Sequence, residues 1–268
     1  MNAPDFPLAA YGLACAGVCA WFSLVWLFCR RRDNWSIIDA AWAATPALFA
    51  LVPLALASGS PRAWAQSAQL ALWGGRLALH LHARVGGGRE REDARYADMR
   101  TRWGDDAPRL MFGFFQIQAA TVWVLLLPAF LAASDTSPYP QFHDIAGALL
   151  VLGGIAGEAF ADASLKKFRA DPANRGRLCE AGLWAYSRHP NYFFEWIVWI
   201  GFAVAALGAP AGFLAILAPV MMYALLRHFS GVPVAEERAA RLKGDAWRDY
   251  AARVNTFFPG PRRKHREP

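Results

Sequence analysis

The chain has 268 residues, of which 56% are hydrophobic and 18% are charged, and its formal net charge is +7. The hydrophobic residues gather in runs long enough to cross a bilayer, which predicts an integral membrane protein and excludes an ordinary soluble domain. Lys and Arg collect in the short segments on one side of these runs, so the positive charge indicates membrane topology, and we expect no nucleic-acid partner.

The hydrophobic runs predict an all-α protein with seven transmembrane helices. In chain order the expected spans cover residues 8–28, 35–57, 63–83, 110–132, 142–165, 191–207 and 211–229. The charged segment 84–109 is expected to be a loop, and residues 236–254 are expected to form one amphipathic helix. This helix either lies on the cytoplasmic membrane surface or covers the mouth of the bundle. Residues 1–260 are thus one predicted membrane domain, followed by a basic, disordered tail at 261–268.

The positions of the basic residues predict the orientation of the chain. With seven spans and the N-terminus outside, the inner segments are 30–32, 84–109, 166–188 and everything from Arg227 onward. These segments hold every Lys and Arg except Arg62, in an outer loop, and Arg76, in the third span. Because cytoplasmic loops are rich in Lys and Arg, the C-terminus is expected in the cytoplasm.

The sequence lacks several motifs that bind metals or nucleotides, and this limits the kinds of site we expect. Cys15, Cys19, Cys29 and Cys179 form no CxxC pair and no metal-ligand spacing, so we predict neither a disulfide framework nor a metal site. There is no GxGxxG and no GxxxxGK[ST] motif, so a nucleotide would not be held by a Rossmann or P-loop element. Asp5 and the lack of basic residues before the first span favour a retained helix over a cleaved signal peptide.

Ionisable residues inside the expected spans are candidates for a functional site, because a charge is costly at membrane depth. Glu158, Asp162 and Lys166 repeat every four residues on the fifth span, and Asn191 and Glu195 do so on the sixth. The carboxylates either accept hydrogen bonds from a ligand or form a self-satisfied stripe in which Lys166 pairs with Asp162. The glycines just before Glu158 would let something approach the helix backbone closely.

The second and third spans offer candidates for an acid. Asp39 lies early in its span, where it is either a surface acid or, if buried, a protonated acid that hydrogen-bonds a substrate carbonyl. His80 shares one face of the third span with Arg76, whose charge we expect to pair with Asp39 or Glu158. A lone His on such a face is more often a hydrogen-bonded core residue than a catalyst.

The segment 166–188 carries six Lys and Arg residues. Turn-forming residues within it would bring together four of them, namely Arg169, Arg175, Arg177 and Arg188. A cluster of this kind can bind phosphate groups bidentately. The simpler alternative is an ordinary positive-inside loop.

Residues 158–169 (EAFADASLKKFR) and 182–203 (GLWAYSRHPNYFFEWIVWIGFA) together resemble the steroid 5-alpha-reductase superfamily. The chain is most similar to its bacterial branch of uncharacterised function, through residues 39–42, 73–77, 92–96 and 174–176. The resemblance implies a seven-helix fold in the bacterial inner membrane and NADPH bound in a cavity that faces the cytoplasm. It also implies a lipophilic small-molecule substrate that enters from among the membrane lipids.

The resemblance implies roles for individual residues. The dinucleotide contacts fall on Glu158, Asp162, Arg169, Asn191 and Glu195, with Arg188 and His189 nearby, and we add Asn174, Arg175 and Tyr192. Asp39 is the first choice for the acid that assists reduction, followed by His80 and Tyr96. Steroid-reducing members carry a Gln-Glu pair on the second helix and a Tyr on the third. This chain has Asp39 on the second and His80 and Leu81 on the third, which leaves the identity of the enone-like substrate open.

A second resemblance leads to a different reaction. Residues 188–192 (RHPNY), followed by Glu236, Glu237 and residues 247–250, also resemble isoprenylcysteine and phospholipid methyltransferases, which bind S-adenosylmethionine at a similar place. That motif leaves the 158–162 stripe unexplained, so NADPH-dependent reduction is the preferred interpretation. A non-catalytic lipid-binding protein is the third alternative.

Overall fold

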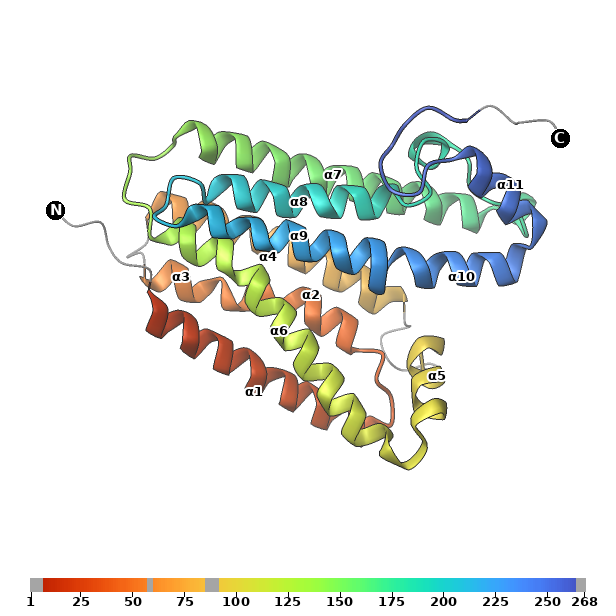
Figure 1. Ribbon diagram of the computed structural model, residues 1–268, viewed down its shortest axis with the longest axis horizontal. Coiled ribbons are helices and arrows are strands. Elements are labelled where there is room, and N and C mark those ends of the chain that lie inside the picture. The colour runs from red at the N-terminus through yellow and green to blue at the C-terminus, as the bar shows by residue number, and fades with distance from the viewer. Residues whose placement is uncertain (1–6, 57–59, 85–91, 264–268) are drawn as a thin grey trace. The chain divides into compact units, whose positions relative to one another are not determined.

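The computed structural model describes residues 7–56, 60–84 and 92–263. Within these ranges the chain is helical and has no strand, apart from an isolated parallel bridge between Ser187 and Asn255 (Figure 1). The prediction of an all-α protein is therefore confirmed. In chain order the α-helices are α1 (Leu8–Arg32), α2 (Ile38–Phe49), α3 (Leu51–Leu56), α4 (Pro61–Arg84), α5 (Ala94–Trp103), α6 (Ala107–Ala133), α7 (Phe142–Ala170), α8 (Pro190–Ala205), α9 (Leu217–Ala224), α10 (Val232–Lys243) and α11 (Asp245–Arg253).

Short 3-10 and π segments join several of these helices. They are η2 (Gly104–Asp106), η3 (Pro172–Asn174), η4 (Gly182–Ala185), η5 (Gly212–Ile216) and η6 (Leu225–Phe229), the last of which is the π segment. Because η5, α9, η6 and α10 follow one another with short breaks, they make a long helical segment where the seventh span was expected.

Four helical segments of the described chain are long and apolar enough to cross a membrane: Leu8–Arg32, Ala94–Ala133, Phe142–Ala170 and Gly212–Lys243. Their length and composition indicate a membrane protein, as the sequence predicted. The other expected spans are shorter or more polar. The second is divided between α2, of 12 residues, and α3, of 6 residues, and the sixth corresponds to α8, of 16 residues. The third corresponds to α4, which is long but carries more polar side chains.

Two expectations about the charged segments were wrong. The predicted helix over 236–254 is two helices, α10 and α11, which part at Gly244 with a φ of +53° that glycine adopts without steric cost. The predicted loop over 84–109 contains α5, which begins after Asp93. The Asp93 side chain accepts a hydrogen bond from the Arg95 amide and so caps this helix. The cap stabilises a short, highly charged helix whose apolar side chains, Tyr96, Met99 and Trp103, pack on the core of unit 1.

The chain divides into two compact units, which we describe separately. Unit 1 comprises Met1–Ile145 and Val204–Ala215, and unit 2 comprises Ala146–Ala203 and Ile216–Pro268. In unit 1, α1 and α6 pack around large apolar side chains that include the fully buried Phe22, Phe115 and Phe130. Polar groups also join these two helices, since the Tyr11 hydroxyl donates a hydrogen bond to the Trp123 carbonyl at 2.7 Å.

In unit 2, α7 and α8 lie side by side (Figure 1), because glycines let their backbones come close. A Cβ at Gly154 of α7 would lie 2.9 Å from the Phe194 carbonyl oxygen of α8. Small residues are a common means of close helix approach in membranes. The glycines before Glu158 therefore admit a neighbouring helix, and this contact sets the polar residues of α7 beside the first turns of α8.

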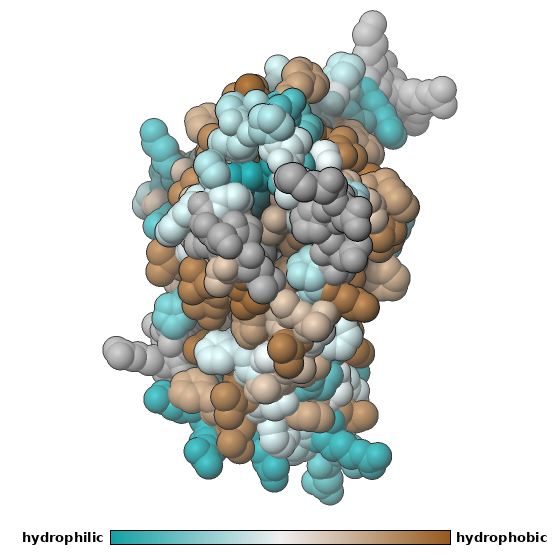
Figure 2. Space-filling model, turned by 90° about the vertical axis from the view of Figure 1, so that its left-hand side faces the viewer, coloured by the Kyte–Doolittle hydropathy of each residue, from teal (hydrophilic) through white to brown (hydrophobic). Residues whose placement is uncertain are grey.

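Large apolar side chains are exposed on both units, among them Leu13, Phe142 and Leu149. Figure 2 shows hydrophobic residues at the surface on one face of the molecule. Soluble monomers rarely expose large contiguous apolar patches, whereas the acyl chains of a bilayer would cover them.

Candidate functional site

The polar stripes of α7 and α8 meet in unit 2. Pro190 and Asn191 are the first two residues of α8, and Pro is tolerated there because its missing N–H would have no helical partner. Asn191 Nδ2 donates a hydrogen bond to Asp162 Oδ1 on α7 at 3.1 Å. The structure thus brings two of the predicted cofactor-binding residues into direct contact where α8 begins.

Buried carboxylates lie one turn away from this contact on either helix. Glu195 of α8 is 5% exposed, and its Oε1 accepts a hydrogen bond from Trp199 Nε1 at 2.9 Å. Glu158 of α7 is 4% exposed. Carboxylates are costly to bury in membrane helices, so two of them within one helical turn of the Asp162–Asn191 contact indicate a polar function for this part of unit 2.

Arg188 joins the start of α8 to the C-terminal segment. Its Nε donates to Glu236 Oε1 on α10 at 2.8 Å, and its Nη2 lies 2.8 Å from the same oxygen. Nη1 donates to the carbonyls of Ala251 and Val254 at 2.7 and 2.8 Å, and Nη2 also donates to the Thr256 hydroxyl at 2.8 Å. A guanidinium has five N–H donors, and the hydrogen bonds to Glu236, Ala251, Val254 and Thr256 use four of them.

His189 lies beside this ion pair. Its side chain is buried, its Nε2 lies 3.1 Å from Glu236 Oε1, and its ring stacks on Tyr192 with centroids 5.3 Å apart. Burial lowers the pKa of His189 below its ordinary value, although Glu236 acts in the opposite direction. Burial thus favours the neutral imidazole. Glu236 is the residue that the reductase resemblance missed, and only the paired acids after residue 235 in the second resemblance pointed to it.

The predicted arginine cluster is not assembled as expected. Arg169, in the last turn of α7, is exposed, and so are Arg175 and Arg177 in the segment that follows; Arg188 uses its donors on the C-terminal segment. Asn174 Nδ2 donates to the Phe168 carbonyl at 3.1 Å and folds the chain back on the end of α7. The three exposed arginines remain available to bind a phosphate group, whereas the contacts of Arg188 hold the C-terminal segment in place.

Asp39 lies in a separate polar cluster, in unit 1. Its Oδ1 accepts a hydrogen bond from the Tyr96 hydroxyl at 2.6 Å, and its Oδ2 accepts from Arg95 at 2.5 Å and from Arg84 at 3.1 Å. Two guanidinium groups thus bind one oxygen of Asp39 and the Tyr96 phenol binds the other, which are contacts that an acidic side chain makes at the end of its helix. The proton donor of this pair is the buried Tyr96 hydroxyl. His80, the other candidate, is exposed on α4.

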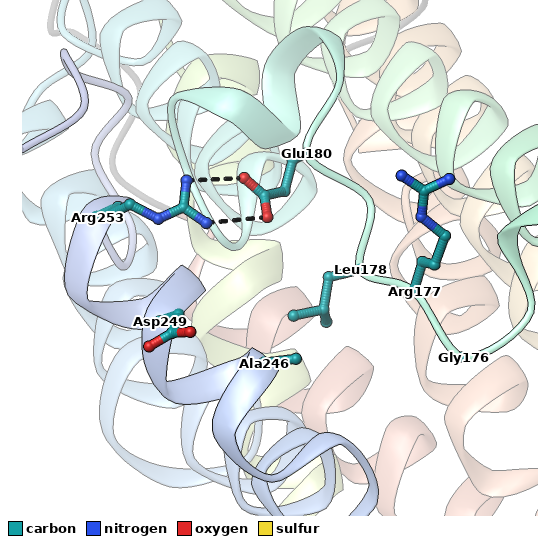
Figure 3. A pocket seen from close by; sticks show the side chains of 7 residues that line it. All are labelled: Gly176, Arg177, Leu178, Glu180, Ala246, Asp249 and Arg253. Atoms are coloured by element: carbon teal, nitrogen blue, oxygen red, sulfur yellow. Dashed lines mark hydrogen bonds and ion pairs between the residues drawn. The ribbon is translucent and has the colours of Figure 1, made fainter. Parts of the chain in front are cut away.

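Two pockets lie against the segment that follows α7 in unit 2. The larger, of about 430 Å³, is lined by residues of that segment and of α11: Gly176, Arg177, Leu178, Glu180, Ala246, Asp249 and Arg253 (Figure 3). In it Arg253 binds both carboxylate oxygens of Glu180 at 3.1 Å. The smaller, of about 330 Å³, includes Asn174 in its wall. Neither pocket is lined by Asp162, Asn191 or Glu195.

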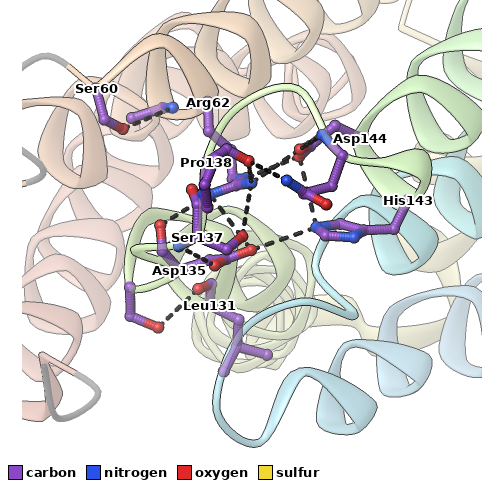
Figure 4. Close-up of polar contacts among 11 residues, drawn as sticks. Ser60, Arg62, Leu131, Asp135, Ser137, Pro138, His143 and Asp144 are labelled. Carbon is purple, nitrogen blue, oxygen red and sulfur yellow. Dashed lines mark hydrogen bonds and ion pairs between the residues drawn. The ribbon is translucent and has the colours of Figure 1, made fainter. Parts of the chain in front are cut away.

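Arg62, the basic residue expected in an outer loop, is buried in unit 1 (Figure 4). It binds both oxygens of Asp144, at 2.7 and 2.8 Å, and its Nη1 lies 3.3 Å from Asp135 Oδ2. His143 Nε2 lies 3.3 Å from the same Asp135 oxygen. The two carboxylates compensate the charge of Arg62, which explains how a cation is accommodated where the positive-inside pattern expects none.

The structure describes part of the C-terminal tail that the sequence predicted at residues 261–268. Arg262 donates hydrogen bonds to the carbonyls of Ala185 and Glu180, and the Arg263 amide donates to the Arg253 carbonyl. The rest of the predicted tail, residues 264–268, lies outside the described residues. Among the residues that are described, no three His, Cys, Asp or Glu side chains are grouped so that they could hold a metal ion.

Comparison of the sequence with known protein families found one family that matches most of the chain. The family described as "Protein of unknown function (DUF1295)" matches residues 25–254. A search of curated proteins and a search of solved structures each found no match to the chain. The matched range contains the Asp162–Asn191 contact, the Arg188–Glu236 ion pair and the Asp39–Tyr96 pair. Because the match covers most of the sequence, the chain belongs to the DUF1295 family.

Proposed function

We propose that this protein is a membrane reductase of the steroid 5-alpha-reductase superfamily that uses NADPH to reduce a polarised double bond in a lipophilic substrate. The observation that carries the proposal is the Asp162–Asn191 hydrogen bond, with Glu195 buried one turn further along α8. These residues lie in the two segments that resemble the superfamily, and both segments fall within the DUF1295 match.

The proposal includes seven membrane crossings, with the N-terminus outside and the C-terminus in the cytoplasm of a bacterial inner membrane. The four long apolar helices and the one-sided distribution of Lys and Arg support it. The remaining crossings would be made by α4, by α8 and by α2 together with α3.

The donor and acceptor groups of unit 2 fit the chemistry of a dinucleotide. The carboxylates of Asp162 and Glu195 can accept hydrogen bonds from ribose hydroxyl or carboxamide groups, and Asn191 can both donate and accept. The exposed Arg169 and Arg175 can neutralise phosphate charge. NADPH, when bound, supplies the hydride. The described chain contributes binding, orientation and the exclusion of water around these buried side chains.

The candidate acid of unit 1 is the Tyr96 hydroxyl. It donates its single O–H to Asp39 at 2.6 Å, so it would have to turn from Asp39 before it could give a proton to a substrate, and Arg95 and Arg84 hold the Asp39 side chain in turn. A Tyr paired with an acid fits the oxygen-binding groups of the steroid-reducing members, although here the Tyr comes from α5 and not from the third span. General-acid assistance of this kind contributes roughly 10²–10⁴ in rate. Asp39 acts as a positioning residue for the phenol.

A second candidate function is methyl transfer from S-adenosylmethionine. The observation that favours it is the contact of Glu236 with both Arg188 and His189, because these residues belong to the motif that resembles the isoprenylcysteine and phospholipid methyltransferases. The same contact is compatible with the reductase, in which Arg188 and His189 lie near the cofactor. The identity of the bound cofactor therefore separates the two candidates.

Thermal unfolding of the detergent-solubilised full chain with NADPH, NADH or S-adenosylmethionine tests the proposal. A ligand at a hundred times its Kd adds about 2.7 kcal/mol to the unfolding free energy. We expect NADPH to raise the melting temperature of the wild type and not that of Glu195→Gln. The control Glu237→Gln changes a carboxylate whose side chain is 69% exposed and should keep the shift.

Stabilisation by S-adenosylmethionine alone would overturn the reductase and support the methyltransferase. No shift with any of these ligands would favour a non-catalytic lipid-binding protein.

A further inference from the structure

The smaller pocket of unit 2, of about 330 Å³, has no role in the proposed reaction. Its wall on the α7 side is made by one face of the last turns, with Phe160, Ser164, Lys167 and Phe168. The opposite wall belongs to the segment that folds back after α7 and includes Asp171 and Asn174.

The α7 wall of the pocket runs from Phe160 to Phe168, along the last turns of that helix. This helix is one of the four that are long and apolar enough to cross a membrane, and its basic residues gather in the last turn. Phe160 is 61% exposed and lies seven residues before Lys167, which is about 10 Å along the helix. If the basic residues mark the headgroup level, Phe160 lies at the depth of the acyl chains.

The pocket wall carries one charge of each sign. Lys167 is exposed and makes no hydrogen bond or ion pair with any described residue, and Asp171 uses its Oδ1 to accept from the Ala173 amide. Two other polar side chains of the wall donate to backbone carbonyls: Ser164 to Ala161 and Asn174 to Phe168. The charged groups of the wall are therefore one ammonium and one carboxylate, beside an apolar strip.

We propose that this pocket binds a membrane phospholipid with an ethanolamine headgroup. The lipid phosphate pairs with Lys167, the lipid ammonium donates to the Asp171 carboxylate, and an acyl chain lies along Phe160. A choline headgroup has no N–H to donate to Asp171, and a glycerol headgroup has no cation for it. The site therefore discriminates by headgroup and not by net charge.

Native mass spectrometry of the full chain in detergent can test this proposal, with equimolar phosphatidylethanolamine, phosphatidylcholine and phosphatidylglycerol of identical acyl chains. The wild type should retain phosphatidylethanolamine preferentially. Lys167→Gln should lower its binding about tenfold, because a hydrogen bond to a charged group is lost. Lys166→Gln is the matched control, since this neighbouring lysine is outside the pocket wall.

Asp171→Asn gives an independent result. Asn keeps a side-chain oxygen that can accept from the Ala173 amide, so the local turn should persist. We expect this variant to bind the ethanolamine and choline lipids equally. Phe160→Ala, at an exposed position, should weaken the binding of all headgroups together.

Three outcomes would overturn the proposal. Equal binding of the three lipids, or a preference for phosphatidylglycerol, would show general attraction to the membrane surface. Equal losses in Lys166→Gln and Lys167→Gln would show a diffuse charge effect. Displacement of the bound lipid by NADPH would show that the pocket binds the cofactor, with Asn174 as one of its contacts. Melting temperatures without added lipid verify that each variant is folded.

Discussion

Arg188 was predicted to lie at a ligand site, but its contacts in the structure stabilise the fold. It was expected to bind phosphate, yet its donors go to Glu236, to two backbone carbonyls and to the Thr256 hydroxyl. Only a guanidinium can satisfy so many acceptors at fixed angles, because its five N–H groups form a planar fork. The C-terminal segment is therefore held in place by a side chain that precedes α8.

Replacing Arg188 by Lys should release this segment. Lys keeps the charge but has three donors without the fork, and we expect the unfolding free energy to fall by roughly 1.5–3 kcal/mol, as for loss of a hydrogen bond to a charged group. Denaturant unfolding in detergent measures the change. Arg241→Lys, at a position whose side chain is 69% exposed, should stay within about 0.5 kcal/mol of the wild type. Equal stability of the two variants would contradict a structural role for Arg188.

The buried His189 gives a pH dependence with a defined sign. Burial lowers its pKa in the folded protein, so between that pKa and the ordinary value of about 6.5 the unfolded chain binds more protons. Its contribution is complete above pH 6.5 and is lost as the pH falls through this range. Melting curves from pH 5 to 8 should show this loss in the wild type and less of it in His189→Gln. The matching change at the exposed His228, His228→Gln, should leave the profile unaltered.

At the scale of the elements, unit 2 depends on the closeness of α7 and α8. The sequence showed glycines before Glu158 but not what they approach, and the structure fills that space with α8. The spacing places Asn191 within hydrogen-bond distance of Asp162. The polar site therefore depends on backbone packing as much as on its own side chains.

Adding one methyl group at Gly154 tests the spacing between α7 and α8. A Cβ at Gly154 would lie 2.9 Å from both the Phe194 carbonyl oxygen and the Val198 nitrogen, so Gly154→Ala must push the helices apart. Overpacking of this kind costs about 1–3 kcal/mol, and the NADPH shift should disappear with it. Gly153→Ala is the control, because its Cβ would meet nothing within 4 Å. Thermal unfolding that ranks both variants alike would refute the packing argument.

At the scale of the molecule, α6 (Ala107–Ala133) gives the proposed membrane orientation two ends that can be distinguished. The α6 helix has 27 residues and thus spans about 40 Å, enough to cross a bilayer. The exposed Thr136 follows its C-terminal end, and the exposed Asp105 precedes its N-terminal end. These two positions are predicted to lie on opposite sides of the membrane.

Cysteine labelling decides the orientation. In a chain whose native cysteines are replaced by Ser, Thr136→Cys should react with an impermeant maleimide in intact cells. Asp105→Cys should react only after permeabilisation. Reaction of both in intact cells would mean that α6 does not cross, and the reverse pattern would invert the topology. The cysteine-free chain reports the background.

The sequence alone determined the class of this protein and the faces of its helices. Apolar runs indicated membrane helices, and the 3.6-residue period placed Glu158 with Asp162 and Asn191 with Glu195, because both signals are local. Local signals also failed where a helix was short and highly charged, as in α5, or where one glycine divided a helical pattern, as at Gly244.

Only the tertiary structure decided which groups meet. Asp39 is bound by Tyr96, 57 residues later, and Arg188 by carbonyls more than 60 residues away. Such partners depend on how the helices pack against one another and on where the loops bring distant residues back to them. The spacing of apolar residues along one helix carries no information about either.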